Sequence, residues 1–122
     1  MNVFELTINE KVYQFRFGMG FFREINKTAV RKNDGITMEQ GFQMAVAKMM
    51  DGDLTGLVDV LDYGNKGQNP RLTRKAIEAY IDDECEDVDS LVRNVLDFLE
   101  QSNSTKKIVQ NLREVVERQA DE

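Results

Sequence analysis

Residues 4–17 read FELTINEKVYQFRF, a stretch in which apolar side chains alternate with polar or charged ones. Alternation with a period of two, rich in aromatic and β-branched residues, is typical of half-buried strands. We predict a β-hairpin with Glu10 and Lys11 at its tip, or a longer loop there, because the Asn-Gly of a tight turn is missing. In this register six apolar side chains share one face, in the pairs Phe4–Phe17, Leu6–Phe15 and Ile8–Tyr13. Helices must cover that face, since a lone hairpin is marginally stable in water.

The rest of the chain repeats apolar side chains at the three- and four-residue spacing of amphipathic helices. The expected helices begin near Phe21, at Met38 after a Thr37–Gln40 capping box, near Leu54, near Leu72 with Asn69 or Thr73 as the cap, at Val88 and near Ile108. Residues 32–36, 51–53 and 64–70 are expected to be loops. The sequence therefore predicts a mostly helical α+β fold, an N-terminal β-hairpin followed by five to six short helices.

A chain of 122 residues suits a single domain, 1–122. We divide it into the hairpin (1–17), a helical body (18–103) and a C-terminal helix (104–122). The C-terminal helix follows a polar linker and lies far from the hairpin in sequence. Two arrangements are therefore open for it: docking on its own core, or mobility and partial packing against another copy.

Residues that most active sites need are missing. The chain contains no His and one Cys, Cys85. The commonest general base and the commonest zinc ligand are therefore absent, and neither a Ser-His-Asp nor a Cys-His arrangement can be built. We expect a non-enzymatic protein without a cofactor. We also expect a cytoplasmic protein with no membrane partner, because no apolar run reaches the length of a membrane span and no leader pattern is present.

The net charge of −6 is unevenly distributed, with +3 on residues 1–32 and −9 on the remainder. The acidic part repels nucleic acid phosphates, so DNA and RNA are not expected partners. The Gly64–Gly67 G-x-x-G pattern is too short to change that expectation. The asymmetry suits head-to-tail self-association or a basic partner, although an ordinary solvated surface gives the same pattern.

Residues 51–62 resemble a calcium-binding loop. The candidate oxygen ligands are Asp51, Asp53, Thr55, Asp59 and Asp62, with Gly56 where the loop needs its sharp turn. Thr55 and Asp62 depart from the usual ligands, and Gly64 interrupts the helix that should follow. The alternative is a break between two helices, with Asp53 or Thr55 as an N-cap.

Two groups of apolar residues are candidates for partner binding. Met44 and Met50 lie at the edges of one helical stripe, and thioethers make adaptable surfaces. The other group is the stripe of the last helix, Ile108, Leu112, Val115 and Val116. These six residues are the predicted protein-binding positions.

Three segments resemble the tail assembly chaperones of long-tailed phages and prophages of Gram-positive bacteria. They are FRFGMGFFREI (15–25) after a short hairpin, NPRLTRKAIEAYIDD (69–83) and DVDSLVRNVLDFLEQS (87–102). The resemblance covers nearly the whole chain, and it is weakest over residues 41–56. The motifs are packing patterns, so they carry no catalytic residues over.

This resemblance implies a virion assembly factor that works in the host cytoplasm and is absent from the finished particle. It would bind the tape measure protein, a long and largely helical rod, and recruit tail tube subunits, with self-association along the rod. The alternatives from the residues alone are a small cytoplasmic regulatory or adaptor protein that binds another protein, and a weak calcium-binding module.

Overall fold

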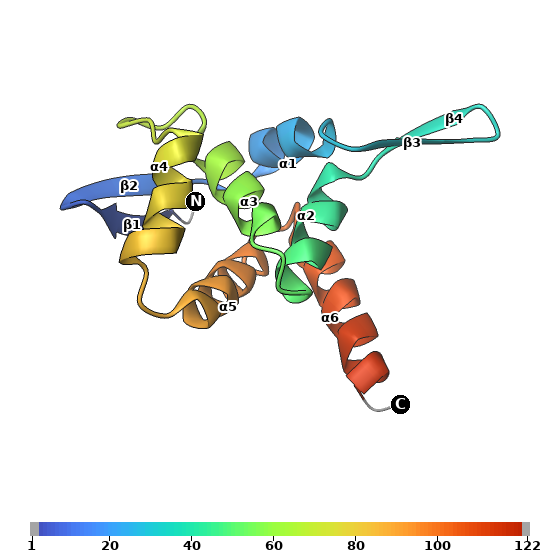
Figure 1. The fold of residues 1–122 in the computed structure, drawn as a ribbon. Helices are drawn as coiled ribbons and strands as arrows, with labels where there is room; N and C mark the ends of the chain where they lie inside the picture. The colour runs from blue at the N-terminus through green and yellow to red at the C-terminus, as the bar shows by residue number, and fades with distance from the viewer. Residues whose placement is uncertain (1–2, 121–122) are drawn as a thin grey trace.

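Two β-hairpins and six α-helices make up residues 3–120, which the computed structural model describes (Figure 1). The elements are β1 (Phe4–Ile8), β2 (Lys11–Phe15), α1 (Met19–Asn26), β3 (Val30–Asn33), β4 (Ile36–Glu39), α2 (Gly41–Met50), α3 (Thr55–Asn65), α4 (Arg74–Ala79), the π-helical turn η1 (Tyr80–Glu84), α5 (Val88–Leu99) and α6 (Lys106–Ala120). The mostly helical α+β fold with an N-terminal hairpin is thus confirmed.

The ends of the predicted hairpin and C-terminal segments, residues 1–2 and 121–122, lie outside the described residues. Within residues 3–120, no helix is long and apolar enough to cross a bilayer.

The first hairpin forms as predicted, but its predicted register is wrong by two residues. Leu6 lies opposite Tyr13 rather than Phe15. The tip is Asn9-Glu10, and both residues have positive φ, 52° and 69°. Such a two-residue turn matches the twist of the strands, so no longer loop is needed. Because strand side chains alternate with a period of two, this shift leaves the apolar residues on the predicted face.

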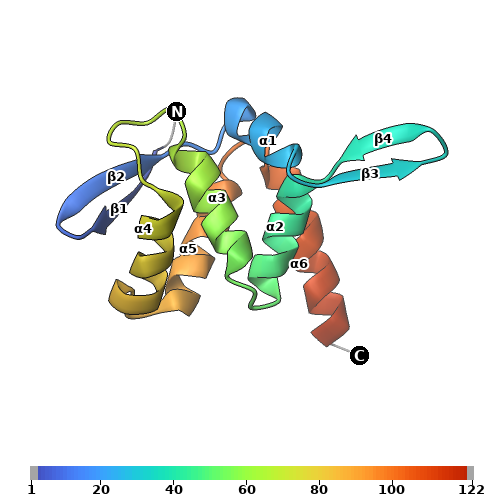
Figure 2. The same ribbon diagram turned by 45° about the horizontal axis from the view of Figure 1, so that its top comes forward.

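A second hairpin, β3–β4, replaces the predicted loop at residues 32–36. Its tip is Asp34-Gly35, again with positive φ at both positions, 51° and 79°. Figures 1 and 2 show it extending away from the helices, on the opposite side from β1–β2. Every residue from 30 to 39 is exposed, so no buried face marks these strands in the sequence.

The predicted capping box at Thr37–Gln40 and the predicted helix start at Met38 are wrong. Met38 lies in β4, half exposed, and α2 begins three residues later at Gly41. Tertiary contacts with α1 set this start. The Phe42 N–H donates to Asn26 Oδ1 at 3.0 Å, and a Cβ on Gly41 would lie 1.9 Å from the carbonyl oxygen of Ile25.

Helix α3 forms the centre of the core and ends near Gly64, as predicted. Its buried residues face α1, α2, α4 and β2. The helices around it bury the apolar face of the first hairpin, as required. Phe98 of α5 packs edge-on against Phe4, with ring centroids 5.4 Å apart. Phe17 lies 5.1 Å from Phe21 of α1.

The junction between α3 and the first hairpin depends on a buried amide. Asn65 is fully buried. Its Nδ2 donates to the carbonyl oxygens of Gln14 at 2.9 Å and Pro70 at 3.3 Å. Its Oδ1 accepts from the Leu72 N–H at 2.5 Å and from Arg71 Nη1 at 2.9 Å. One side chain thus connects β2, the end of α3 and the following loop.

The sequence correctly marked two helix starts. Thr73 Oγ1 accepts from the Ala76 N–H at 3.1 Å and caps α4, the second of the two predicted caps. Asp87 Oδ1 accepts from the Ser90 N–H at 3.0 Å and caps α5. A side-chain oxygen at this position satisfies an amide that the helix itself leaves unpaired.

We expect Asn65→Ala to lower the free energy of unfolding by about 3 kcal/mol, because it leaves the buried Leu72 N–H without a partner. Urea unfolding followed by circular dichroism measures the change. Asn111→Ala, at an exposed position of α6, is the control and should change stability by less than about 0.5 kcal/mol. Equal effects of the two substitutions would contradict the role given to Asn65.

Gly64→Ala should destabilise the fold by about 2 kcal/mol through overpacking. The added Cβ would lie 2.4 Å from Phe17 Cε1, and Phe17 is itself buried. Gly20→Ala, in α1 with no atom within 4 Å of the added Cβ, should instead stabilise by about 0.5 kcal/mol through helix propensity. Thermal unfolding of both variants gives opposite shifts if this packing is correct.

Candidate functional site

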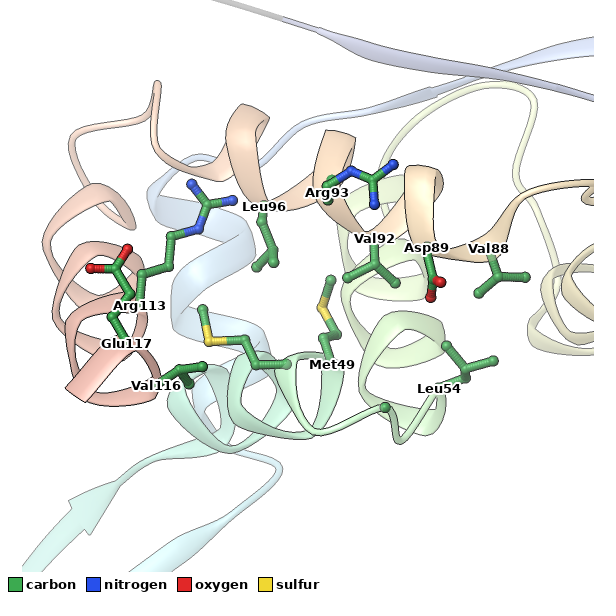
Figure 3. A pocket seen from close by; sticks show the side chains of 12 residues that line it. Met49, Leu54, Val88, Asp89, Val92, Arg93, Leu96, Arg113, Val116 and Glu117 are labelled. Carbon is green, nitrogen blue, oxygen red and sulfur yellow. The ribbon is translucent and has the colours of Figure 1, made fainter. Parts of the chain in front are cut away.

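An apolar groove of about 680 Å³ runs between α2, α5 and α6 (Figure 3). Its lining residues are Met49, Met50, Gly52, Leu54, Val88, Asp89, Val92, Arg93, Leu96, Arg113, Val116 and Glu117. In Figure 3, Val92 and Leu96 of α5 point toward Met49 of α2, and Val116 lies at the side formed by α6. Charged side chains from α5 and α6 stand around these apolar residues. An apolar wall with charged groups around it is typical of surfaces that bind other molecules.

A second hollow, of about 430 Å³, lies on the other side of the contact between α2 and α6. Met50 and Val116 line both hollows, so we treat them as one feature, the α6 surface. The other residues of the second hollow are Met44, Ala47, Lys48, Asp51, Asp53, Leu112, Val115 and Gln119.

The α6 surface brings together most of the residues predicted to bind a partner. These are Met44, Met50, Leu112, Val115 and Val116. The exposed fractions of Met44, Val115 and Val116 are 48%, 39% and 43%, which is high for apolar side chains that line a hollow. Ile108 lines neither hollow; like Met50 and Leu112, it is partly buried and packs against the core. That these residues bind a partner stays a prediction.

The first half of α6 is docked on its own chain. Val109 is fully buried, and Thr105 Oγ1 donates to the Leu99 carbonyl oxygen at 2.5 Å. Arg113 donates to Asp97 Oδ1 and Glu100 Oε2 of the α5 region, each at 3.0 Å. The C-terminal end of α6 extends past the body of the molecule (Figure 2), whereas Val115 and Val116 line the second hollow together with residues of α2.

Several wall residues of the groove were expected to lie in the core. On α5, Leu91, Val95 and Leu99 are buried, whereas Val88 and Val92 are only half-buried. The sequence did contain a signal for such a surface. The apolar stripe of α5 is broader than a single contact between two helices requires. Periodicity alone does not reveal which edge of the stripe stays uncovered, because that depends on where α6 lies.

The turn between α2 and α3 accounts for much of the calcium-like pattern. Gly52 takes a positive φ of 86°. Asp53 Oδ1 accepts from the Thr55 N–H at 3.0 Å and from Thr55 Oγ1 at 2.6 Å. The hydrogen bonds from Thr55 lower the pKa of Asp53 below its usual value. The break between two helices, which was the alternative to a metal loop, is thus present, but the N-cap of α3 is Leu54 without a side-chain cap, so the predicted cap at Asp53 or Thr55 is wrong.

Two further carboxylates of that pattern, Asp59 and Asp62, form ion pairs with arginines. Asp59 pairs with Arg74, and the bond from Arg74 to Asp59 raises the pKa of the guanidinium. Asp62 pairs with Arg71 at 2.9 Å and with Arg74 at 3.2 Å. Within residues 3–120, no three His, Cys, Asp or Glu side chains gather closely enough to hold a metal ion. The five predicted ligands are therefore not brought together as one set.

Comparison with known proteins gives one match. No curated protein and no solved structure matches the chain. A model of a protein family described as phage tail assembly chaperone protein, TAC, matches residues 5–114. The matched region runs from β1 into α6 and includes both hairpins and most of the α6 surface. The resemblance found in the sequence is thus confirmed over nearly the whole chain, and the chain belongs to the phage tail assembly chaperone family.

Proposed function

We propose that this protein is a non-enzymatic tail assembly chaperone that binds the tape measure protein and recruits tail tube subunits during tail assembly. Family membership supports the role in tail assembly. The observation that carries the finer proposal is the apolar groove between α2, α5 and α6. In this proposal the protein acts in the host cell cytoplasm, before the virion is complete, and it is absent from the finished particle.

The groove has the chemistry needed to bind one face of a helix. A groove between helices accepts apolar side chains that recur at three- and four-residue spacing. Here Val92, Leu96 and Val116 supply apolar walls. Half-buried Met50 supplies a flexible thioether side chain that adapts to different sequences, whereas Met49 beside it is buried in the core. A groove of this kind suits a long rod that offers many similar but unequal helical segments.

The charges at the groove favour selectivity. Asp89, Arg93 and Glu117 line it, while Arg113 is already paired with Asp97 and Glu100. Charges at the rim of an interface contribute mainly to partner choice and association rate, whereas buried apolar contacts contribute most of the affinity. The apolar walls of the groove are therefore the part to test.

We expect Val116→Asp to weaken binding of the tape measure protein at least about tenfold, because the substitution places a carboxylate in the apolar wall of the groove. The assay is co-purification of the chain with the tape measure protein of the same phage, followed by titration. A third component, the tail tube subunit, is then added to test recruitment.

Val12→Asp is the matched control for that experiment. Val12 is an exposed valine, 51% against 43% for Val116, and it lies on β2, away from the α6 surface. It should bind within about twofold of the wild type. If the wild-type chain forms no complex, the proposed function is wrong. If it binds and Val116→Asp binds equally well, only the location of the site is wrong.

A further inference from the structure

The β3–β4 hairpin is an arm that contacts little of its own chain. We call residues 30–39 the arm. All ten of these residues are exposed, and the arm points away from the helices (Figures 1 and 2). It carries three apolar side chains with no core to enter, Val30, Ile36 and Met38. An isolated two-stranded hairpin is only marginally stable in water, so a second pair of strands would stabilise it.

The register of the arm places two of its three apolar residues, Ile36 and Met38, on the same face. Arg31 lies opposite Met38 and Asn33 opposite Ile36, so these four residues share one face. Ile36 is 64% exposed and Met38 is 50% exposed. Both belong to β4, which contains no Lys or Arg. Strand β3 carries the adjacent cations Arg31 and Lys32.

The hydrogen-bond alternation shows which backbone groups point outward. The Gln40 N–H donates to the Ala29 carbonyl oxygen at 2.8 Å. In an antiparallel pair, bonded and non-bonded positions alternate. The Lys32–Thr37 pair is therefore a non-bonded position, and the backbone N–H and C=O of Thr37 point away from β3. Those of Lys32 point outward from the opposite edge of the arm.

Charge decides between these two edges. Symmetric pairing of two copies through β3, centred on the outward-pointing Lys32, would place Lys32 directly opposite Lys32 of the second copy, and like charges directly opposite each other are destabilising. Lysine on an edge strand is a common device against such pairing. The β4 edge has no such charge between Ile36 and Met38, and it has no proline or bulge.

We propose that two copies of this chain associate through their β4 edges to form a four-stranded antiparallel sheet centred on Thr37. The two Thr37 residues exchange both backbone N–H···O bonds across the two-fold axis. Ile36 of each copy then lies opposite Met38 of the other, which brings the exposed apolar side chains of β4 into contact. The outer strands are β3 from each copy, and their cations stop further addition, so the assembly closes at two chains.

The expected affinity of this dimer is modest, because the contact is limited to two four-residue strands. Permanent dimers bury about 2,000 Å² or more in total, which is beyond the reach of such short strands. We therefore expect monomer and dimer to exchange and to shift with protein concentration. The arm lies away from the α6 surface (Figure 2), so this inference does not depend on the proposed function, and the groove stays open in the dimer.

Light scattering over a range of chain concentrations tests the proposal. The wild type should approach twice the chain mass at high concentration, and Thr37→Pro should remain at one chain mass. Proline at this position removes an outward N–H without removing a bond between β3 and β4. A wild type that stays monomeric at every concentration overturns the proposal, as does a Thr37→Pro variant that still dimerises.

Lys32→Pro is the matched control, because Lys32 forms the same cross-strand pair with Thr37 but faces the other edge. It should dimerise like the wild type. Equal loss of the dimer in both proline variants overturns the choice of edge. No arm residue is buried, so both variants should unfold at the wild-type midpoint.

A charge exchange tests the register without proline. Ile36→Lys and Met38→Glu should each abolish the dimer alone, because each places a charge opposite an apolar side chain. Mixing the two variants pairs the introduced lysine with the introduced glutamate and leaves one Ile36–Met38 pair intact. Two-chain species should return in the mixture only. A mixture that stays monomeric contradicts the proposed register.

Discussion

The buried side chain of Asn65 is the contact on which the remaining arrangement depends. It satisfies backbone groups of Gln14, Pro70 and Leu72 at once, and it does so where no water is available to replace it. The preceding residue completes the junction, since the Gly64 carbonyl accepts from the Arg16 N–H at 2.8 Å. The hairpin is therefore fixed in both position and angle on the end of α3.

Fixing the hairpin on α3 also positions the helices that form the α6 surface. Phe4 and Phe17 of the hairpin region pack against Phe98 of α5, so α5 is aligned with the hairpin. Thr105, Val109 and Arg113 then hold the start of α6 against the α5 region. The groove lies where Val116 of α6 faces residues of α2 and α5. A tail assembly chaperone thus keeps an apolar surface available on a well-packed body.

Two local patterns that suggested ligand chemistry have structural causes. The G-x-x-G of residues 64–67 provides a close approach to Phe17 at Gly64 and a positive φ of 82° at Gly67. The acidic pattern of residues 51–62 is divided between a turn just before α3 and ion pairs with Arg71 of the following loop and Arg74 of α4. Short motifs give the same letters for both purposes, because turns and ion sites need glycine and carboxylates alike.

The sequence by itself determined the family, and also the first hairpin and the apolar stripes of the helices, because the latter two depend on residues that are close in the chain. It narrowed the cap of α4 to Asn69 or Thr73. The tertiary structure decided the rest. The alternation of apolar and polar residues could not predict the register of the first hairpin, because a shift of two residues leaves every side chain on the same face. The strands of the arm could not be predicted from the sequence, because strands with no buried face show no hydrophobic periodicity. The groove depends on Met44, Met50 and Val116 meeting from two helices far apart in sequence, and only packing around Asn65 and α3 brings those helices together.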